Sequence, residues 1–195
     1  MYIGYFQPTA TGYRCELDLE ARLIIARLSG EIMTLLDAPA DENAVLRALV
    51  VDETREPPED PALLSLLPPM SEDPDEAQAL RTLTEDTLRL TKSERLLEII
   101  TALENLTSQD EDALEVPKET AWEWLSALND VRLVLAQRLE VQSPQSAQAA
   151  LHKGAEFFAG EEDGDEEEII AALYYLITWW QDSLLQAVRF SDLDQ

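Results

Sequence analysis

The chain has 195 residues, enough for one sizeable hydrophobic core, and 46% of them are hydrophobic, which excludes a wholly disordered protein. Forty acidic residues against fourteen basic ones give a net charge of −26, so the surface repels nucleic-acid phosphates and anionic lipid. We therefore expect neither a nucleic acid nor a membrane as partner. Two interpretations of the acidic charge stay open: it keeps the protein soluble among other acidic proteins, or it attracts a protein partner with a basic surface.

The N-terminal part is predicted to form a β-hairpin over residues 1–17, because two β-prone runs flank the turn-forming segment Pro-Thr-Ala-Thr-Gly. An isolated hairpin is marginally stable, so this one should pack on helices. Asp18 can then cap a long helix that ends near Leu36. A short helix is expected over residues 43–51.

The middle of the chain has two helix starts of one kind, Asp60-Pro61 and Asp73-Pro74, in which a capping residue precedes a proline. The second of these helices should reach about Leu90. The segment Thr-Lys-Ser-Glu at 91–94 matches a capping box, which predicts a kink or a new helix there. Residues 108–116 are predicted to be a loop.

The C-terminal half should contain three helices, from Pro117 to about Val141, from Ser143-Pro144 to about Phe158, and from Ile169 onward. Residues 161–168 hold seven acids and should form a mobile, solvated loop, whose last residues lie at the N-terminus of the final helix, where negative charge favours the helix dipole. The last helix is expected to bury Ile169, Ile170, Leu173, Leu176, Ile177, Trp180, Leu184 and Val188. The sequence thus predicts one mainly α domain over 1–195, a multi-helix bundle with a short N-terminal β-hairpin.

One arginine, Arg132, falls inside the apolar arc of the helix that begins at Pro117. A buried guanidinium stays charged and needs a carboxylate or several carbonyls around it. Asp130 lies on the opposite side of the same helix, so the carboxylate should come from another helix. Glu31 is the best candidate and Glu20 the second, and we predict an architectural, mostly buried ion pair.

An alternative interpretation places Arg132, Asn129 and Asp130 in a pocket that binds a small molecule or a substrate. Other catalytic patterns are missing from the sequence. One histidine and one cysteine permit no site with two imidazoles and no cysteine cluster, and the six glycines form no phosphate-binding loop. We therefore expect no cofactor, no metal site and a non-enzymatic interaction or regulatory protein. A DNA mimic would need acids spaced regularly on one face, whereas these acids cluster in loops.

Tyr175 and Trp179 share a face of the last helix, apart from the stripe that contains Trp180. Two interpretations stay open for this face. It is either buried between helices on two sides, or exposed as an aromatic surface for a partner or a homodimer.

The expected compartment is the cytoplasm. The single cysteine, Cys15, cannot form an internal disulfide, and the first residues lack the basic and apolar segments of a signal peptide.

Three segments together resemble one family: DPALLSLLPPMSEDPDEAQALRTLTEDTL at 60–88, AWEWLSALNDVRLVLAQRLEV at 121–141 and WWQDSLLQAV at 179–188. With them the chain resembles the DUF2017 family of actinobacteria. The resemblance implies a bacterial regulator or adaptor in protein turnover, because genes of this family often lie beside the Clp-protease adaptor that binds N-terminal degrons. It also makes Arg81 a candidate for a structural ion pair or a ligand contact, with Leu80 where the family favours an aromatic residue.

Overall fold

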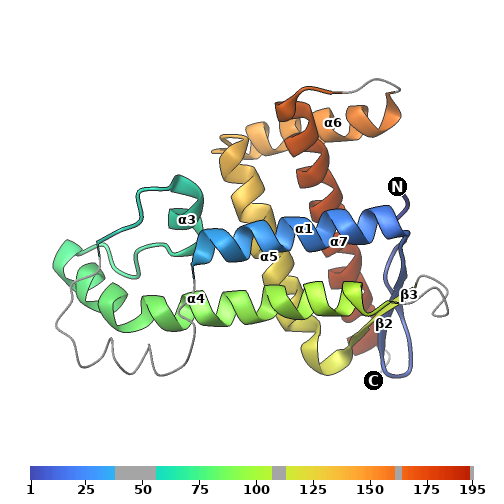
Figure 1. Ribbon diagram of the computed structural model, residues 1–195, viewed down its shortest axis with the longest axis horizontal. Helices are drawn as coiled ribbons and strands as arrows, with labels where there is room; N and C mark the ends of the chain where they lie inside the picture. Colours follow the sequence, from blue (N-terminus) through green and yellow to red (C-terminus); the bar gives the residue numbers. More distant parts are fainter. Residues whose placement is uncertain (38–55, 107–112, 161–163, 194–195) are drawn as a thin grey trace.

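The computed structural model of the protein describes residues 1–37, 56–106, 113–160 and 164–193. This part of the chain is mainly helical with one small sheet, as predicted (Figure 1). Its elements in chain order are β1 (Gln7–Pro8), β2 (Gly12–Glu16), α1 (Leu19–Leu36), α3 (Pro61–Leu66), α4 (Pro74–Glu104), β3 (Ala113–Pro117), the short 3-10 helix η1 (Lys118–Thr120), α5 (Ala121–Arg138), α6 (Pro144–Ala159) and α7 (Glu166–Leu193).

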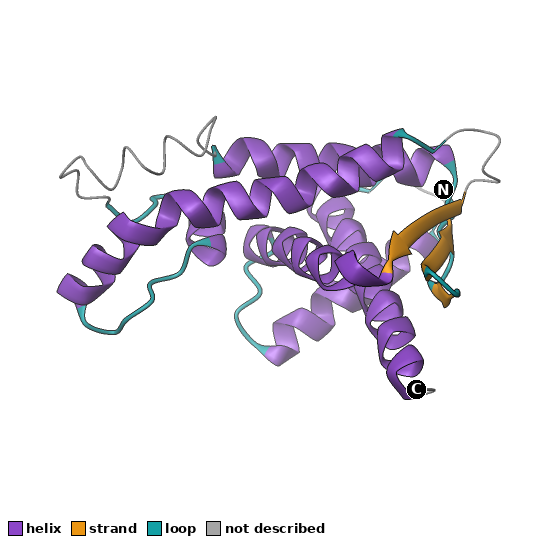
Figure 2. Ribbon diagram, turned by 90° about the horizontal axis from the view of Figure 1, so that it is seen from below, coloured by secondary structure: helices purple, strands orange, loops and turns teal. Residues whose placement is uncertain are grey.

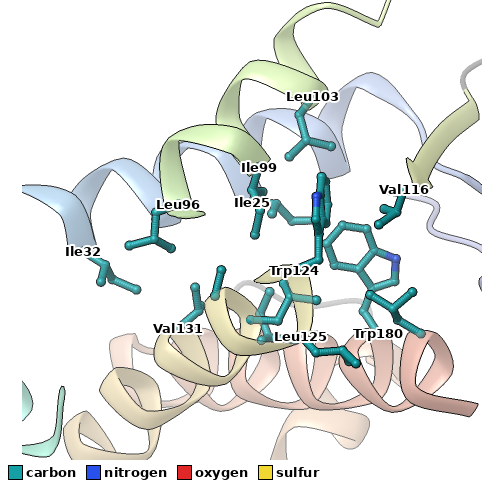
Figure 3. Close-up of a cluster of buried hydrophobic side chains, with 14 of the residues drawn as sticks. Ile25, Ile32, Leu96, Ile99, Leu103, Val116, Trp124, Leu125, Val131 and Trp180 are labelled. Atoms are coloured by element: carbon teal, nitrogen blue, oxygen red, sulfur yellow. The ribbon is translucent and has the colours of Figure 1, made fainter. Parts of the chain in front are cut away.

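The helices form two layers. Helices α1 and α4 lie side by side, and α5 and α7 cross behind them at a steep angle (Figures 1 and 2). Helix α6 packs on α7, where Gly154 is so close to the neighbouring helix that a Cβ atom would come within 2.2 Å of the Ala171 carbonyl oxygen. The core lies between the layers, where the rings of Trp124 and Trp180 meet edge to face with centroids 6.4 Å apart (Figure 3).

The predicted capping residues start their helices. Asp18, Asp60 and Asp73 each accept a hydrogen bond from a backbone N–H of the following turn, and Ser143 forms a capping box with Ser146. Helix α5 begins at Ala121 after η1 and ends at Arg138, earlier than predicted. Its end is followed by Glu140, which has a left-handed backbone with φ of 52°. The helix predicted over residues 43–51 lies outside the described residues.

The predicted break at Thr91 is wrong, because α4 runs without interruption through that position. One buried stripe continues along it at helical spacing. It consists of Arg81, Glu85, Arg89, Ser93, Leu96, Ile99 and Leu103. The first half of the stripe is charged and the second half is apolar. Burial of the charged half therefore depends on ion pairing and not on apolar side chains.

The predicted hairpin is present, but the sheet has a third strand that the sequence analysis assigned to a loop. Strand β3 pairs antiparallel with β2, from Gly12 opposite Pro117 to Glu16 opposite Ala113. Leu114 and Val116 are buried and Glu115 is exposed, which is the alternation expected of a strand with one face on the core. The rest of the predicted loop, residues 108–112, lies outside the described residues.

The acidic loop predicted over residues 161–168 ends earlier in the structure, because its last three residues are helical. Residues 166–168 belong to the first turn of α7, and the Asp165 carboxylate accepts a hydrogen bond from the Glu168 N–H. Acidic side chains in a first turn are favoured by the helix dipole, which explains why these residues are helical. The loop predicted over 161–163 lies outside the described residues. Ile169 is 45% exposed, so its predicted burial is wrong, whereas Trp180, Leu184 and Val188 are buried as expected.

None of the described helices combines the length and the apolarity needed to cross a bilayer.

Candidate functional site

A row of buried charges on α4 is the most unusual chemical feature of the interior. We call Arg81, Glu85 and Arg89 the α4 charge ladder. In it, Glu85 lies one helical turn after Arg81 and one turn before Arg89. Glu85 accepts hydrogen bonds from Arg81 Nη1 at 2.7 Å and from Arg89 Nη2 at 2.8 Å. All three residues are buried: Glu85 is 3% exposed, Arg81 7% and Arg89 9%. Burial alone would raise the pKa of Glu85, but the two guanidinium groups outweigh it, so this pKa is lowered.

The same two arginines reach the ends of other helices. Arg81 Nη2 donates to the carbonyl of Leu67, the C-cap of α3, at 3.2 Å, and Arg89 Nη1 donates to the carbonyl of Leu36, the last residue of α1. Arg22, the third buried arginine, donates to the carbonyl of Leu106 just beyond α4 at 3.1 Å. Carbonyls at helix C-termini lack partners within their helix and carry the negative end of the dipole. Each buried arginine therefore ties one helix to the end of another.

A second buried ion pair joins α4 to α5. Asp130 is only 3% exposed and accepts a hydrogen bond from Lys92 Nζ at 2.6 Å. Its other oxygen, Oδ2, is also buried and has no hydrogen-bond partner among the described residues. Burial raises the pKa of Asp130, and the hydrogen bond and charge of Lys92 oppose this only in part. The side of α5 that the sequence analysis placed away from the core thus faces α4.

The predicted ion pair of Arg132 is wrong. Arg132 is half-buried, and its Nη2 donates to Asn129 Oδ1 at 2.9 Å on the same helix. Glu31 is paired instead with Arg27 at 3.0 Å on the exposed side of α1, and Glu20 contacts the amino group of Met1 at 2.6 Å. The reason is that α1 turns its buried face, with Ile25 and Ile32, toward the core, and Glu31 is outside that face.

The structure brings only two of the three predicted pocket residues together. Asn129 and Arg132 are hydrogen-bonded, whereas Asp130 binds Lys92 in the contact between α4 and α5. Four hollows of the described surface are lined by other residues. The arrangement therefore gives no support to a ligand pocket built from these three side chains.

The predicted aromatic surface is partly covered by other parts of the chain. Tyr175 and Trp179 are both half-buried. The ring of Tyr175 lies 6.0 Å from that of Phe158 in α6, and the ring of Trp179 lies 4.7 Å from that of Tyr5. The outer aromatic residues are thus Tyr5 and Phe158, which are 65% and 42% exposed. A homodimer through this surface stays a prediction.

Metal-ligating side chains are not gathered anywhere in the described residues in groups of three or more. The single histidine, His152, is exposed and lies 3.2 Å from Glu156, its i+4 neighbour on α6.

Buried charges cancel one another in the described part of the chain. Arg22, Arg81 and Arg89 are buried, and so are Glu85, Asp86 and Asp130. Three positive and three negative side chains leave no net charge in the interior. The net charge of −26 therefore belongs entirely to the remaining residues.

Arg81 was a predicted site residue, but its partners Glu85 and the Leu67 carbonyl were not predicted. An arginine, a glutamate and an arginine at successive i+4 positions were visible at 81, 85 and 89, and such spacing favours ion pairs on one helix face. The ladder lies on the same face as Leu96 and Ile99, which was the signal that it is buried.

A family model described as "Domain of unknown function (DUF2017)" matches residues 3–188. No curated protein and no solved structure gives a match. The matched range includes the charge ladder, the Lys92–Asp130 pair and all three segments on which the sequence resemblance depends. This protein therefore belongs to the DUF2017 family.

Proposed function

We propose that this protein is a non-enzymatic, cytoplasmic interaction or regulatory protein that binds a basic protein partner through its acidic surface. The observation that carries the proposal is the cancellation of charge in the interior, which leaves the full −26 on the other residues. A surface of one sign raises the association rate with a partner of opposite sign and disfavours partners of the same sign. We further infer a role in protein turnover from the gene neighbourhood that the family resemblance implies.

Exposed apolar side chains add contact area to this surface. The described residues include thirteen large hydrophobic side chains that are at least 38% exposed, and they lie on several elements, including α1, α4 and the ends of α5 and α7. Charge alone gives weak, salt-sensitive attraction, whereas apolar and aromatic anchors supply most of the affinity in protein interfaces. A basic partner with apolar residues among its charges fits such a surface.

Affinity capture with the full chain as bait, from the cells in which it occurs, tests the proposal. We expect captured proteins with basic surfaces, and their retention should fall as the salt concentration rises from about 0.1 M to about 1 M, where the Debye length shrinks to about 3 Å. A charge-reduced bait provides the matched control, with Glu72, Glu94 and Glu104 changed to Gln and Asp75 to Asn. All four side chains are exposed and none caps a helix.

The reduced bait should retain less partner at low salt while keeping the same circular dichroism spectrum, and the difference between the two baits should shrink as the salt concentration rises. A partner retained equally by both baits, or an absence of any partner at low salt, would contradict the proposal.

A further inference from the structure

A hollow of about 270 Å³ lies on the outer side of the N-terminal hairpin. We call it the tyrosine hollow, and its lining residues are Tyr2, Ile3, Gly4, Tyr5, Gln7, Arg14 and Glu16. Pockets for small molecules are usually larger, on the order of 300 to 1,000 Å³. The hollow lies close to the lower end of this range and has room for one long side chain of a partner.

An irregularity in the hairpin shapes the hollow. Ile3 pairs with Leu17 and Gln7 pairs with Arg14, so the N-terminal segment has one more residue between these two pairs than its partner strand. Such a β-bulge redirects side chains at the edge of a sheet. At the bulge, Gly4 donates to the Glu16 carbonyl at 2.7 Å, and a Cβ atom at Gly4 would lie 3.4 Å from the Tyr2 hydroxyl. The tighter contact of such a Cβ atom would be with the Glu16 carbonyl oxygen, at 3.2 Å, so glycine allows the two backbone segments to approach closely at the bulge.

Two tyrosines and a carboxylate give the hollow its chemistry. Tyr2 and Tyr5 are 57% and 65% exposed, and the ring of Tyr5 is supported by Trp179 at a centroid distance of 4.7 Å. The carboxylate of Glu16 is exposed and lines the hollow. Aromatic faces attract cations, and a carboxylate forms charge-assisted hydrogen bonds with them. The hollow therefore suits a positively charged side chain.

Arg14, which also lines the hollow, has a negative neighbour of its own. It lies opposite Glu115 in the pairing of β2 with β3. The pKa of Glu115 is lowered by hydrogen bonds from Thr11 and Thr9 and, to a smaller extent, by the charge of Arg14. Glu115 thus offsets part of the charge of Arg14 from the neighbouring strand, so Glu16 is not the only carboxylate near this arginine.

We propose that the tyrosine hollow binds an arginine side chain of the basic partner, with the guanidinium stacked on the tyrosine rings and hydrogen-bonded to Glu16. Arginine fits better than lysine because its planar guanidinium can stack on a ring and bind a carboxylate through two donors. The inference rests on the proposed function, since it assigns a contact site to the same basic partner.

Fluorescence anisotropy of a peptide, Ser-Gly-Arg-Gly-Arg-Gly-Ser with a neutral dye, tests the proposal on the full chain. A second peptide has citrulline in place of arginine, which keeps the shape and removes the charge. We expect Tyr2→Leu to weaken binding of the arginine peptide about 2- to 5-fold, as expected for a cation–π contact at an exposed site, and Tyr2→Phe to retain it. Glu16→Gln should also weaken binding about 2- to 5-fold.

Two controls separate the hollow from general attraction. Trp122→Leu removes a ring that is 59% exposed at the start of α5, and Glu94→Gln removes one exposed carboxylate from α4. Neither should weaken binding as much as the corresponding change in the hollow. If Glu16→Gln equals Glu94→Gln and Tyr2→Leu equals Trp122→Leu, the hollow is not the site, although the proposed function stands. If the citrulline peptide binds as tightly as the arginine peptide, the proposed function fails as well.

Discussion

Replacing Glu85 by Gln should destabilise the protein strongly, because it removes the charge of the one carboxylate that both buried arginines, Arg81 and Arg89, are shown to bind. Both hydrogen-bond the same carboxylate, at 2.7 and 2.8 Å, and both are less than 10% exposed. Removing one partner of a buried ion pair costs about 3 to 5 kcal/mol, and in a chain of this size each kcal/mol lowers the melting temperature by roughly 2 to 4 °C. We expect a loss of about 3 to 5 kcal/mol for Glu85→Gln, since two charges lose their partner.

The matched control is Glu31→Gln, which removes an ion pair of the same i,i+4 spacing at the surface. The side chains of Arg27 and Glu31 are 83% and 61% exposed, so this change should cost about 0.5 kcal/mol or less. Urea unfolding followed by circular dichroism measures both variants and also shows whether the slope against urea changes.

The low pKa of Glu85 adds a pH dependence to this prediction. A carboxyl group with a lowered pKa stabilises the folded state above its unfolded pKa of about 4.3, and this contribution disappears as the pH falls through the folded value. The difference between the wild type and Glu85→Gln should therefore shrink below about pH 4. A loss for Glu85→Gln no larger than that for Glu31→Gln at pH 7 would refute the reasoning.

Three other changes probe the interior. Asp130→Asn should cost less than Glu85→Gln at pH 7, because burial raises the pKa of Asp130 and so opposes its ionisation in the folded protein; the folded state then binds the proton more readily than the unfolded state, so the cost of Asp130→Asn, measured by urea unfolding, should grow as the pH falls from neutral to acid. Cys15 is 1% exposed, and burial raises its pKa to about 11. A thiol reagent at pH 8 should therefore label it only when the protein is unfolded in urea, and rapid labelling of the folded protein would contradict its burial. Gly154→Ala should loosen α6 from α7 despite the better helix propensity of alanine, because its Cβ would meet the Ala171 carbonyl at 2.2 Å; unchanged hydrogen exchange in α6 would show that the helices adjust.

Local signals in the sequence predicted the helix starts well. A capping side chain acts on the backbone of the next turn, so Asp18, Asp60, Asp73 and Ser143 could be identified without knowledge of the tertiary structure. Alternation of Leu114, Glu115 and Val116 was too short a pattern to distinguish a strand from a loop, because its pairing partner lies about a hundred residues earlier.

Buried charge was the feature that sequence reasoning placed wrongly. The apolar arc of a single helix indicates which face is buried only when that face is apolar. Arg132 lies within such an arc and is half-buried, whereas Arg81 and Arg89 lie among charged residues and are buried. Their burial depends on Glu85 and on carbonyls of other helices, and no single segment contains all of these groups. The tyrosine hollow likewise depends on strand pairing that only the fold provides.

The arginine donors at helix ends have a consequence for how the molecule folds. The Leu36 carbonyl at the end of α1 is satisfied by Arg89, 53 residues later, and the Leu106 carbonyl beyond α4 by Arg22, 84 residues earlier. Neither helix end can be completed within its own segment, so α1 and α4 each need the other before their last turns are secure. Contacts so distant in sequence form late and are lost together. The layer of α1 and α4 should consequently behave as one cooperative unit, in which the last turn of α1 and the end of α4 gain and lose protection from hydrogen exchange at the same free energy.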